Sequence, residues 1–145
     1  MYKIVRADER HRKDLNRLMR KYLWSTLTKD EPITNYWIIR DDKCKVVACC
    51  GLDFHNGNAI LTSLAVEKGF RHQGIGSALV THRLKIAKQR AAKFVALITM
   101  YYHFNFYKKR GFRTCPRADL PTSIKSYSQF TTSRYKKCAV MFRPI

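Results

Sequence analysis

The chain has 145 residues, of which 29 are Lys or Arg and 10 are Asp or Glu, so its formal net charge is +19. Hydrophobic residues make up 46% and aromatic residues 12%, which excludes a disordered chain and provides enough apolar side chains for a buried core. The charge predicts attraction to polyanions such as nucleic acid, an anionic membrane or an acidic ligand, or it reflects a generally basic proteome. We expect a single domain over residues 1–145.

The five cysteines are odd in number and have no CxxC spacing: Cys44, Cys49, Cys50, Cys115 and Cys138. They predict neither a zinc site nor a disulfide framework, and free thiols are typical of a reducing compartment. Cys49 and Cys50 are neighbours in a strand-like run and should point to opposite faces. Residues 1–13 are too charged for a secretory signal, and the longest apolar run, 46–52, is too short to cross a membrane. The sequence therefore predicts a cytoplasmic protein with no metal and no membrane contact.

The first half of the chain predicts one helix among several strands. Asp8 is expected to cap a helix whose apolar residues recur at three- and four-residue steps. These residues are Leu15, Leu18, Met19, Tyr22 and Leu23. Alternating or apolar runs predict strands over residues 2–6, 36–39, 45–54 and 59–66. The Asn56-Gly57 pair predicts a tight hairpin between the last two strands.

The second half begins with a long amphipathic helix over residues 74–92. Its apolar stripe is expected to contain Ile75, Leu79, Val80, Leu84, Ile86, Ala87 and Ala91. The other side is expected to carry Arg83, Lys85, Lys88 and Arg90. The apolar run within residues 93–99 predicts a central strand. Further elements are expected over 101–109 (a short helix ended by Gly111-Phe112), 121–130 (a short helix) and 138–142 (a strand).

The stretch Leu64 to Ala78 reads as a strand end, a turn with two glycines and a helix start. The N-terminus of a helix offers free N–H groups and the positive end of the helix dipole, which favour a phosphate or pyrophosphate. Two glycines alone are a weak signal, and across proteins such a pair more often shapes a plain strand-to-helix turn. The stretch lacks the third glycine of a dinucleotide fingerprint and the Lys-Ser/Thr of a P-loop.

Several motifs in this context resemble those of the GNAT N-acetyltransferases. Arg71, Gly74 and Gly76 match the family pattern Gln/Arg-x-x-Gly-x-Gly/Ala, and Tyr107-x-x-x-Gly111-Phe112 matches its late signature. The resemblance implies an α/β (α+β) GNAT fold, with a mixed, mostly antiparallel sheet of about six or seven strands and about four helices. Residues 117–130 and 138–141 are similar to a subgroup of short amino-acid N-acetyltransferases, which includes N-acetylglutamate synthase domains and arsenic-resistance acetyltransferases.

The resemblance also implies a binding site for acetyl-CoA. The pyrophosphate would be bound by the glycine turn, residues 71–78: Arg71, His72, Gln73, Gly74, Ile75, Gly76, Ser77 and Ala78. The backbone of Leu64, Ala65 and Val66 would pair with the pantetheine arm, and an N–H near Leu64 or Val66 would polarise the thioester carbonyl. By the same resemblance Tyr107 would protonate the departing thiolate. The alternative for Tyr107 is a packed aromatic side chain.

The sequence leaves the general base and the acceptor open. Glu67 could relay a proton through water, or it is a solvated carboxylate; Asp53 and His55 are candidates that also suit a turn. Ile60 and Thr62 stand where some relatives carry Glu or His, which favours an easily deprotonated amine.

We expect direct attack by the primary amine of a small molecule, an amino acid or analogue being favoured, on acetyl-CoA in a ternary complex. The alternatives are a macromolecular amine, on aminoacyl-tRNA or protein, and a basic RNA- or ribosome-binding protein on a vestigial acetyltransferase fold. A homodimer is also compatible with the sequence.

Overall fold

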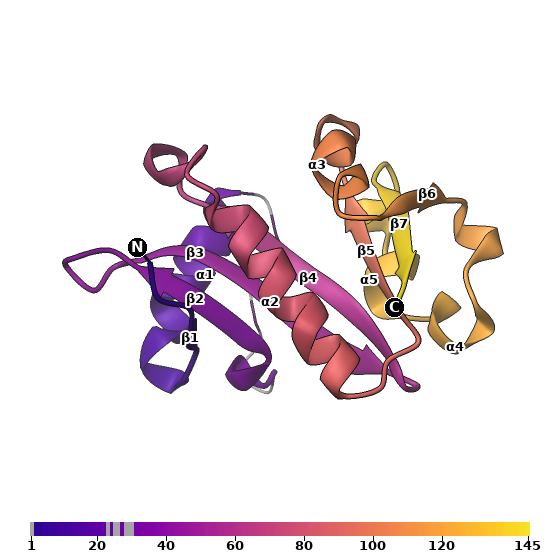
Figure 1. Cartoon of the computed structure of the whole chain (residues 1–145), viewed down its shortest axis with the longest axis horizontal. Coiled ribbons are helices and arrows are strands. Elements are labelled where there is room, and N and C mark those ends of the chain that lie inside the picture. Colours follow the sequence, from indigo (N-terminus) through magenta and orange to yellow (C-terminus); the bar gives the residue numbers. More distant parts are fainter. Residues whose placement is uncertain (1, 23, 25–26, 28–30) are drawn as a thin grey trace. The chain divides into compact units, whose positions relative to one another are not determined.

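The computed structural model describes residues 2–22, 24, 27 and 31–145, and their strands form one mixed sheet (Figure 1). The strands are β1 (Val5–Arg6), β2 (Tyr36–Arg40), β3 (Val46–His55), β4 (Asn58–Val66), β5 (Phe94–Thr99), β6 (Arg113–Cys115) and β7 (Ala139–Pro144). Their hydrogen-bonded order is β1-β2-β3-β4-β5-β7-β6. The β4–β5 pair is parallel, whereas β1–β2, β2–β3, β5–β7 and β6–β7 are antiparallel. The expected mixed, mostly antiparallel sheet is therefore confirmed.

The described helices are α1 (Arg12–Lys21), α2 (Ile75–Gln89), α3 (Phe104–Lys108), α4 (Thr122–Lys125) and α5 (Ser128–Thr131). Short 3₁₀ turns lie between them: η1 (Glu9–His11), η2 (Ile33–Asn35), η3 (Lys68–Phe70), η4 (Tyr101–His103), η5 (Arg117–Asp119) and η6 (Ser133–Tyr135). Among the described helices, α1 and α2 are the two that are long enough to cover several strands.

The chain forms two compact units. Unit 1 contains residues 1–52 and 63–84, and unit 2 contains residues 53–62 and 85–145. Strands β3 and β4 and helix α2 each run through both units. A single domain over 1–145 stays a prediction.

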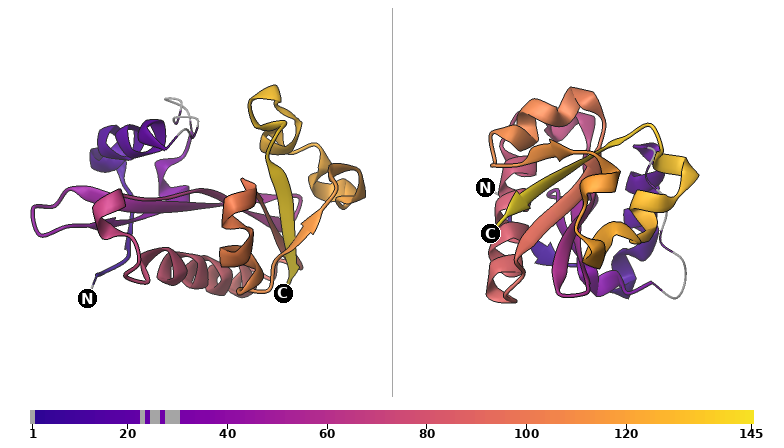
Figure 2. Two further views of the ribbon diagram at one scale, coloured as in Figure 1. Left: turned by 90° about the horizontal axis from the view of Figure 1, so that it is seen from above. Right: turned by 90° about the vertical axis from the view of Figure 1, so that its right-hand side faces the viewer.

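In unit 1, helices α1 and α2 lie on opposite sides of the strands, as the left view of Figure 2 shows. The core beneath α1 contains Leu15, Leu18 and Ile38 together with Cys49. Cys50 points to the other face, where burial raises the pKa of its thiol to about 12 despite the positive charge of Arg83. The prediction that the two neighbouring cysteines face opposite sides is confirmed.

Two glycine-containing turns form as the sequence predicts. Asn56 and Gly57 have φ angles of 51° and 81°, the left-handed pair that a tight two-residue hairpin needs. Gly111 has a φ of 88° and ends α3, because the Phe112 N–H donates to the Tyr107 carbonyl at 3.1 Å.

Several boundaries differ from the predictions. Strand β1 has two residues instead of five, and the helix expected over 121–130 is divided into α4 and α5. Helix α2 ends at Gln89 rather than at residue 92, because Ala91 is left-handed (φ 59°) and the Ala92 N–H closes the end on the Ala87 carbonyl at 3.0 Å. Strand β6 was not expected, since three partly exposed residues carry no apolar pattern. Leu23, expected in the first helix, lies outside the described residues.

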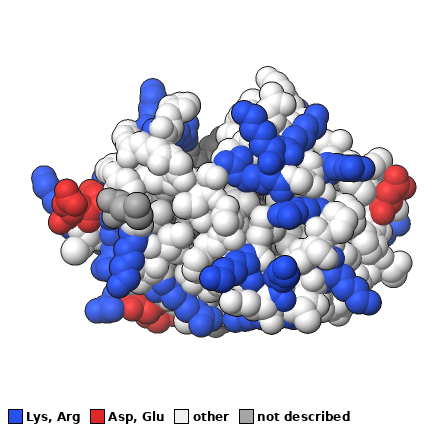
Figure 3. Space-filling view, in the orientation of Figure 1, with Lys and Arg blue, Asp and Glu red and all other residues white. Residues whose placement is uncertain are grey.

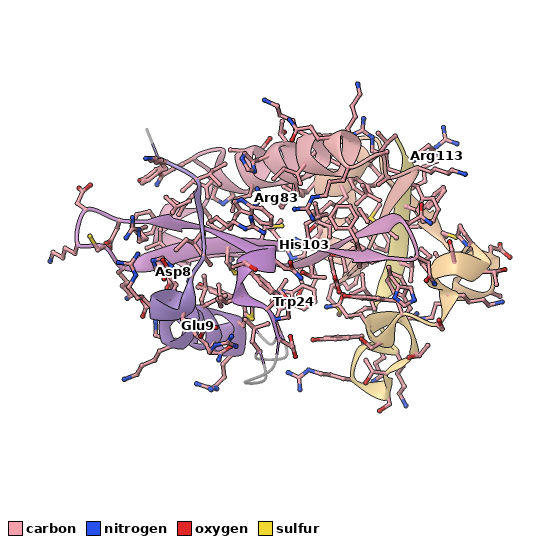
Figure 4. All side chains as sticks on the ribbon, turned by 90° about the horizontal axis from the view of Figure 1, so that it is seen from below. Asp8, Glu9, Trp24, Arg83, His103 and Arg113 are labelled. Carbon is pink, nitrogen blue, oxygen red and sulfur yellow. The ribbon has the colours of Figure 1, made fainter. Side chains whose placement is uncertain are left out.

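The prediction that Arg83 lies on the polar side of α2 is wrong. Its side chain is fully buried, with 0% exposed, and its guanidinium carbon lies 3.6 Å from the centre of the Trp37 ring (Figure 4). The spacing explains this position, because Arg83 follows Leu79 by four residues and precedes Ala87 by four, on one helix face. The chemical type of the side chain misled the prediction, since a guanidinium plane can stack on an indole.

Candidate functional site

The end of β4 presents one backbone edge away from β3. Glu67 donates its N–H to the Val47 carbonyl of β3 at 2.8 Å, and backbone directions alternate along a strand, so Leu64 and Val66 face the opposite edge. There the Leu64 carbonyl accepts from the Trp24 indole N–H at 3.1 Å, and the Val66 carbonyl accepts from Arg71 Nε at 3.0 Å. This edge is therefore held by side-chain donors, which an added ligand strand could exchange.

Ser63 marks a local irregularity just before this edge. Its φ angle is 48°, a left-handed conformation that is uncommon for serine and costs of order 1 kcal/mol. Such distortions within strands re-aim the following residues and are frequent next to functional sites. The segment from Leu64 to Val66 thus follows a bend in β4.

The glycine turn joins β4 to α2 through two left-handed residues. His72 has a φ of 62° and Gly74 a φ of 79°, and the helix begins with the Ala78 N–H donating to the Gly74 carbonyl at 2.9 Å. The residues His72, Gln73 and Gly74 are exposed, whereas Ile75 is buried and anchors the first helical turn. A Cβ placed on Gly74 would meet no atom within 4 Å. Open space therefore lies beside a turn from which the first N–H groups of a helix have no intrahelical acceptor.

Glu67 is placed in a group of cations from α1. Its Oε2 accepts from Arg17 Nη1 at 3.3 Å, and its Oε1 forms a short contact with Lys21 Nζ. Burial raises the pKa of the Glu67 carboxyl, but the hydrogen bonds from Lys21 and Arg17 outweigh burial and hold that pKa below its ordinary value. Glu67 is therefore ionised and ion-paired near neutral pH.

Tyr22 connects Glu67 with the glycine turn. Its hydroxyl lies 3.2 Å from Glu67 Oε1 and accepts the Lys68 backbone N–H at 2.9 Å. The guanidinium carbon of Arg71 lies 4.9 Å from the centre of the Tyr22 ring. One side chain of α1's C-terminal end thus touches both the residue after β4 and the first residue of the turn.

The helical pattern predicted Tyr22 only as an apolar position and did not reveal this contact. Arg17 and Lys21 are four residues apart on one side of α1. Like charges at this spacing repel each other slightly, so a carboxylate between them is favourable, but nothing in the sequence identifies Glu67 as that carboxylate.

Tyr107 belongs to unit 2 and lies in α3 with 6% of its surface exposed. Its ring packs edge-on against Phe106 and Phe112, at centroid distances of 5.0 and 5.7 Å. Tyr107, the candidate proton donor, is therefore also a well-packed aromatic side chain.

Asp53 and His55 contact a common partner in unit 2. Asp53 accepts from the Tyr127 hydroxyl at 2.9 Å, and the His55 ring lies edge-on to the Tyr127 ring at 5.5 Å. Ile60 and Thr62, also expected without a catalytic role, are buried in β4. These contacts fit the structural alternative that the sequence left open for the hairpin.

Unit 1 brings together Glu67, the 64–66 edge and the glycine turn. Within the described ranges, no group of three or more His, Cys, Asp and Glu side chains could hold a metal ion. No helix in the described part of the chain is long and apolar enough to cross a membrane.

A family model described as an acetyltransferase (GNAT) domain matches residues 32–114, more than half of the chain. The chain therefore belongs to the GNAT acetyltransferase family. Similar curated proteins include an uncharacterized N-acetyltransferase of Chlorobaculum tepidum, CT2212, which is 28% identical over 61% of this chain and 56% of its own length. N-alpha-acetyltransferase 30 of Schizosaccharomyces pombe is 27% identical over 69% of this chain and 71% of its own length. The match thus spans little more than half of the first relative.

Solved structures share the fold at low sequence identity. Rv2747 from Mycobacterium tuberculosis, in complex with CoA and NLQ, has a TM-score of 0.83 at 19% identity over 99% of both chains. N-acetylglutamate synthase from Neisseria gonorrhoeae, complexed with coenzyme A and N-acetyl-glutamate, has a TM-score of 0.78 at 18% identity. That alignment covers 99% of this chain and 35% of the synthase. The GNAT fold expected from the sequence is thereby confirmed.

Proposed function

We propose that the chain is an acetyl-CoA-dependent N-acetyltransferase that acetylates a primary amine by direct transfer. The observation that carries this proposal is the glycine turn, which has open space at Gly74 and lies between the Leu64–Val66 edge of β4 and the N-terminus of α2. A diphosphate beside this turn would meet backbone N–H groups and the positive end of the α2 dipole. The two similar solved structures are complexes with CoA, which supports acetyl-CoA as the donor.

In this proposal the Leu64–Val66 edge pairs with the pantetheine arm. The ligand would exchange with the Trp24 and Arg71 side chains that now donate to the carbonyls of that edge. An N–H of the same edge would donate to the thioester oxygen as negative charge develops on it. Fixed backbone dipoles are suited to this role because they need no reorganisation during the reaction.

The transfer step forms one bond and breaks one. The neutral amine nitrogen attacks the thioester carbonyl carbon, a C–N bond forms, and the C–S bond breaks with its electron pair leaving on sulfur. The amine nitrogen releases its proton to solvent water, and the thiolate takes a proton from the Tyr107 hydroxyl, the proposed donor, which is then reprotonated from water. A thiolate is already a fair leaving group, so we expect Tyr107 to contribute a modest factor.

We assign Glu67 a positioning role rather than the role of general base. Its carboxylate is engaged by Lys21 and Arg17, and its lowered pKa makes it a weak proton acceptor. Through the Tyr22 hydroxyl it holds the start of the glycine turn in place. The amine would then be an acceptor that is partly neutral near pH 7, such as an α-amino group with a pKa of about 8.

The acceptor that we favour is a small amine, an amino acid or an analogue. The similar synthase that is complexed with N-acetyl-glutamate supports this class. A protein N-terminus is the second candidate, which the similarity to N-alpha-acetyltransferase 30 favours. The two acceptors share the α-amino group and differ in the rest of the molecule that carries it.

An acceptor screen tests the proposal. Free thiol released from acetyl-CoA is measured with amino acids, polyamines, peptides with a free N-terminus and charged tRNA as acceptors. We expect release with α-amino acceptors, and Tyr107→Phe should lower kcat about tenfold without changing the affinity for acetyl-CoA. No thiol release with any acceptor would contradict the proposed activity, and an unchanged kcat would remove Tyr107 from the mechanism.

A further inference from the structure

Unit 2 carries a group of cations on α3 and the strands beside it. We call this group the cationic cluster; it consists of Lys108, Lys109, Arg110, Arg113 and Arg143. Figure 3 shows Lys and Arg side chains gathered over the α3 and β6 region, and Figure 4 shows Arg113 at the edge of the molecule. The cluster lies outside the glycine turn and the β4 edge, which belong to unit 1.

The members of the cluster come from the end of α3, from β6 and from β7. Arg113 pairs in β6 with Phe142 of β7, so its side chain leaves the sheet on the Phe142 face and that of the next residue, Arg143, on the opposite face. The Arg143 side chain covers Gly111, because a Cβ on that glycine would lie 3.0 Å from Arg143 Nε. Lys108 and Lys109 end the helix that Gly111 terminates. Arg143 therefore lies next to the turn that carries Lys108, Lys109 and Arg110, and Arg113 follows that turn on the edge strand β6.

Aromatic rings fix two of these cations. The guanidinium carbon of Arg110 lies 3.8 Å from the centre of the Phe106 ring, and its Nη1 donates to the Phe106 carbonyl. Lys108 Nζ lies 5.9 Å from the centre of the Phe104 ring. A guanidinium held flat against a ring has little rotamer freedom left to lose when it meets a phosphate.

No carboxylate of unit 2, all of whose residues are described, forms an ion pair with the cluster. Unit 2 has only two Asp or Glu side chains: Asp53 accepts from Tyr127, and Asp119 lies in η5. Adjacent like charges repel and cost stability unless an anion from outside neutralises them. The cluster is thus built to attract a polyanion.

Exposed aromatic rings lie immediately before the cluster in the chain. Tyr101 is 74% exposed and Tyr102 is 64% exposed, and their ring centroids are 5.5 Å apart. The ring centroids of Tyr102 and His103 lie 4.5 Å apart. Exposed flat rings and a positive surface are the two features that single-stranded nucleic acids use, since phosphates meet the cations and bases stack on the rings.

We propose that the cationic cluster and the Tyr101–Tyr102 pair form a binding surface for single-stranded RNA. The charge recognises the phosphate backbone, and the tyrosines accept bases without reading their sequence. An anionic membrane would also meet the charge, but among the described residues unit 2 exposes only three large apolar side chains, Tyr101, Tyr102 and Ile145, which is too few for the apolar face of a membrane-surface helix. RNA binding at this surface does not require the proposed acetyl transfer, and it is tested in the absence of acetyl-CoA.

Fluorescence anisotropy with a labelled oligouridylate of about 15 nucleotides tests the surface. We expect saturable binding that weakens steeply from about 50 to about 200 mM salt, with log K falling by about 0.7 per log unit of salt for each phosphate contact. The variant Lys108→Glu/Lys109→Glu/Arg113→Glu should weaken binding at least tenfold and make that slope shallower by about 2. Tyr101→Ala/Tyr102→Ala should weaken binding about tenfold and leave the slope unchanged.

Lys85→Glu/Lys88→Glu/Lys125→Glu is the matched control, because it changes the net charge of unit 2 equally at exposed positions on α2 and α4. We expect this control to bind the oligonucleotide within about threefold of the unaltered protein. An equal loss in both triple variants would show that net charge alone attracts RNA and would overturn the proposal. Full competition by excess CoA, or binding to vesicles of anionic phospholipid without binding to the oligonucleotide, would overturn it as well.

Discussion

The two units carry the positive charge of the chain in different ways. Unit 1 has 15 Lys and Arg against 8 Asp and Glu, a net charge of +7, whereas unit 2 has 14 against 2, a net charge of +12. In unit 1 the carboxylates of Asp8, Glu9, Asp14 and Glu67 each form an ion pair within the unit. Among the residues that the structure describes, the cationic cluster of unit 2 has no carboxylate partner. Carboxylates in unit 1 therefore pair with cations that serve the fold and the proposed site, whereas the cationic cluster of unit 2 is available to an external anion.

Arg83 is the exception that most sharply tests this comparison. It lies in unit 1, yet Nε, Nη1 and Nη2 are buried with no hydrogen-bond partner among the described residues. Burial lowers the pKa of its guanidinium to about 10. Its stabilising contact is the Trp37 ring at 3.6 Å, an interaction worth about 2 kcal/mol when desolvated.

The largest expected effect is a gain in stability when this charge is removed. Arg83→Met keeps the apolar stem and removes a buried cation without a counter-ion, so we expect the free energy of unfolding to rise by about 1–2 kcal/mol. Urea denaturation monitored by circular dichroism measures the change. Arg83→Lys keeps the charge but loses the flat stacking surface, and it should be less stable than the unaltered protein. A loss of more than about 2 kcal/mol in Arg83→Met would contradict the view that the guanidinium is unpaired.

The next effect concerns the paired charge of Glu67. Because its folded-state pKa is lowered, its contribution is present above its ordinary pKa of 4.5 and is lost as the pH falls below that value. Glu67→Gln should therefore lower stability by about 1 kcal/mol near pH 7 and have a smaller effect near pH 3. Denaturation at the two pH values measures both. Asp42→Asn, which alters an exposed carboxylate of unit 1, is the control, and equal losses at both pH values for Glu67→Gln would rule out the ion pairs as its cause.

The smallest effect compares exposed lysines in the two units. Lys109→Glu places a carboxylate within the cationic cluster and should raise the free energy of unfolding by a few tenths of a kcal/mol. Lys43→Glu makes the same charge change beside Asp41 and Asp42 in unit 1 and should lower it by a similar amount. Thermal melts at low and high salt measure both, and the two effects should shrink as salt rises. The same sign in both variants would show that the two units do not differ in how their charge is balanced.

Much of the fold was predictable because its signals are local. The Asn56-Gly57 hairpin, the apolar strand β5 and the Gly111 helix stop each depend on residues adjacent in the chain. Strand β6 could not be predicted, since its three residues are defined by backbone pairing with β7 rather than by their own pattern. The burial of Arg83 depends on the distant Trp37, which the helical spacing alone does not identify.

The candidate site also contains one part that was predictable from local sequence and one part that was not. The glycine turn is a local motif and was readable from Arg71, Gly74 and Gly76, together with the family resemblance. The surroundings of Glu67 were not readable, because Arg17, Lys21 and Tyr22 reach it from a segment more than forty residues earlier. Those contacts change the proposed role of Glu67 from proton relay to positioning residue.

Calorimetric titration with acetyl-CoA tests most directly the central claim that the glycine turn binds the donor. We predict one-site binding by the unaltered protein and its loss in Gly76→Asp, which would place a carboxylate against the pyrophosphate. Gly69→Asp adds the same charge in η3, where a Cβ meets no atom within 4 Å, and it should retain binding. Unchanged affinity in Gly76→Asp, or no binding by the unaltered protein, would contradict the claim.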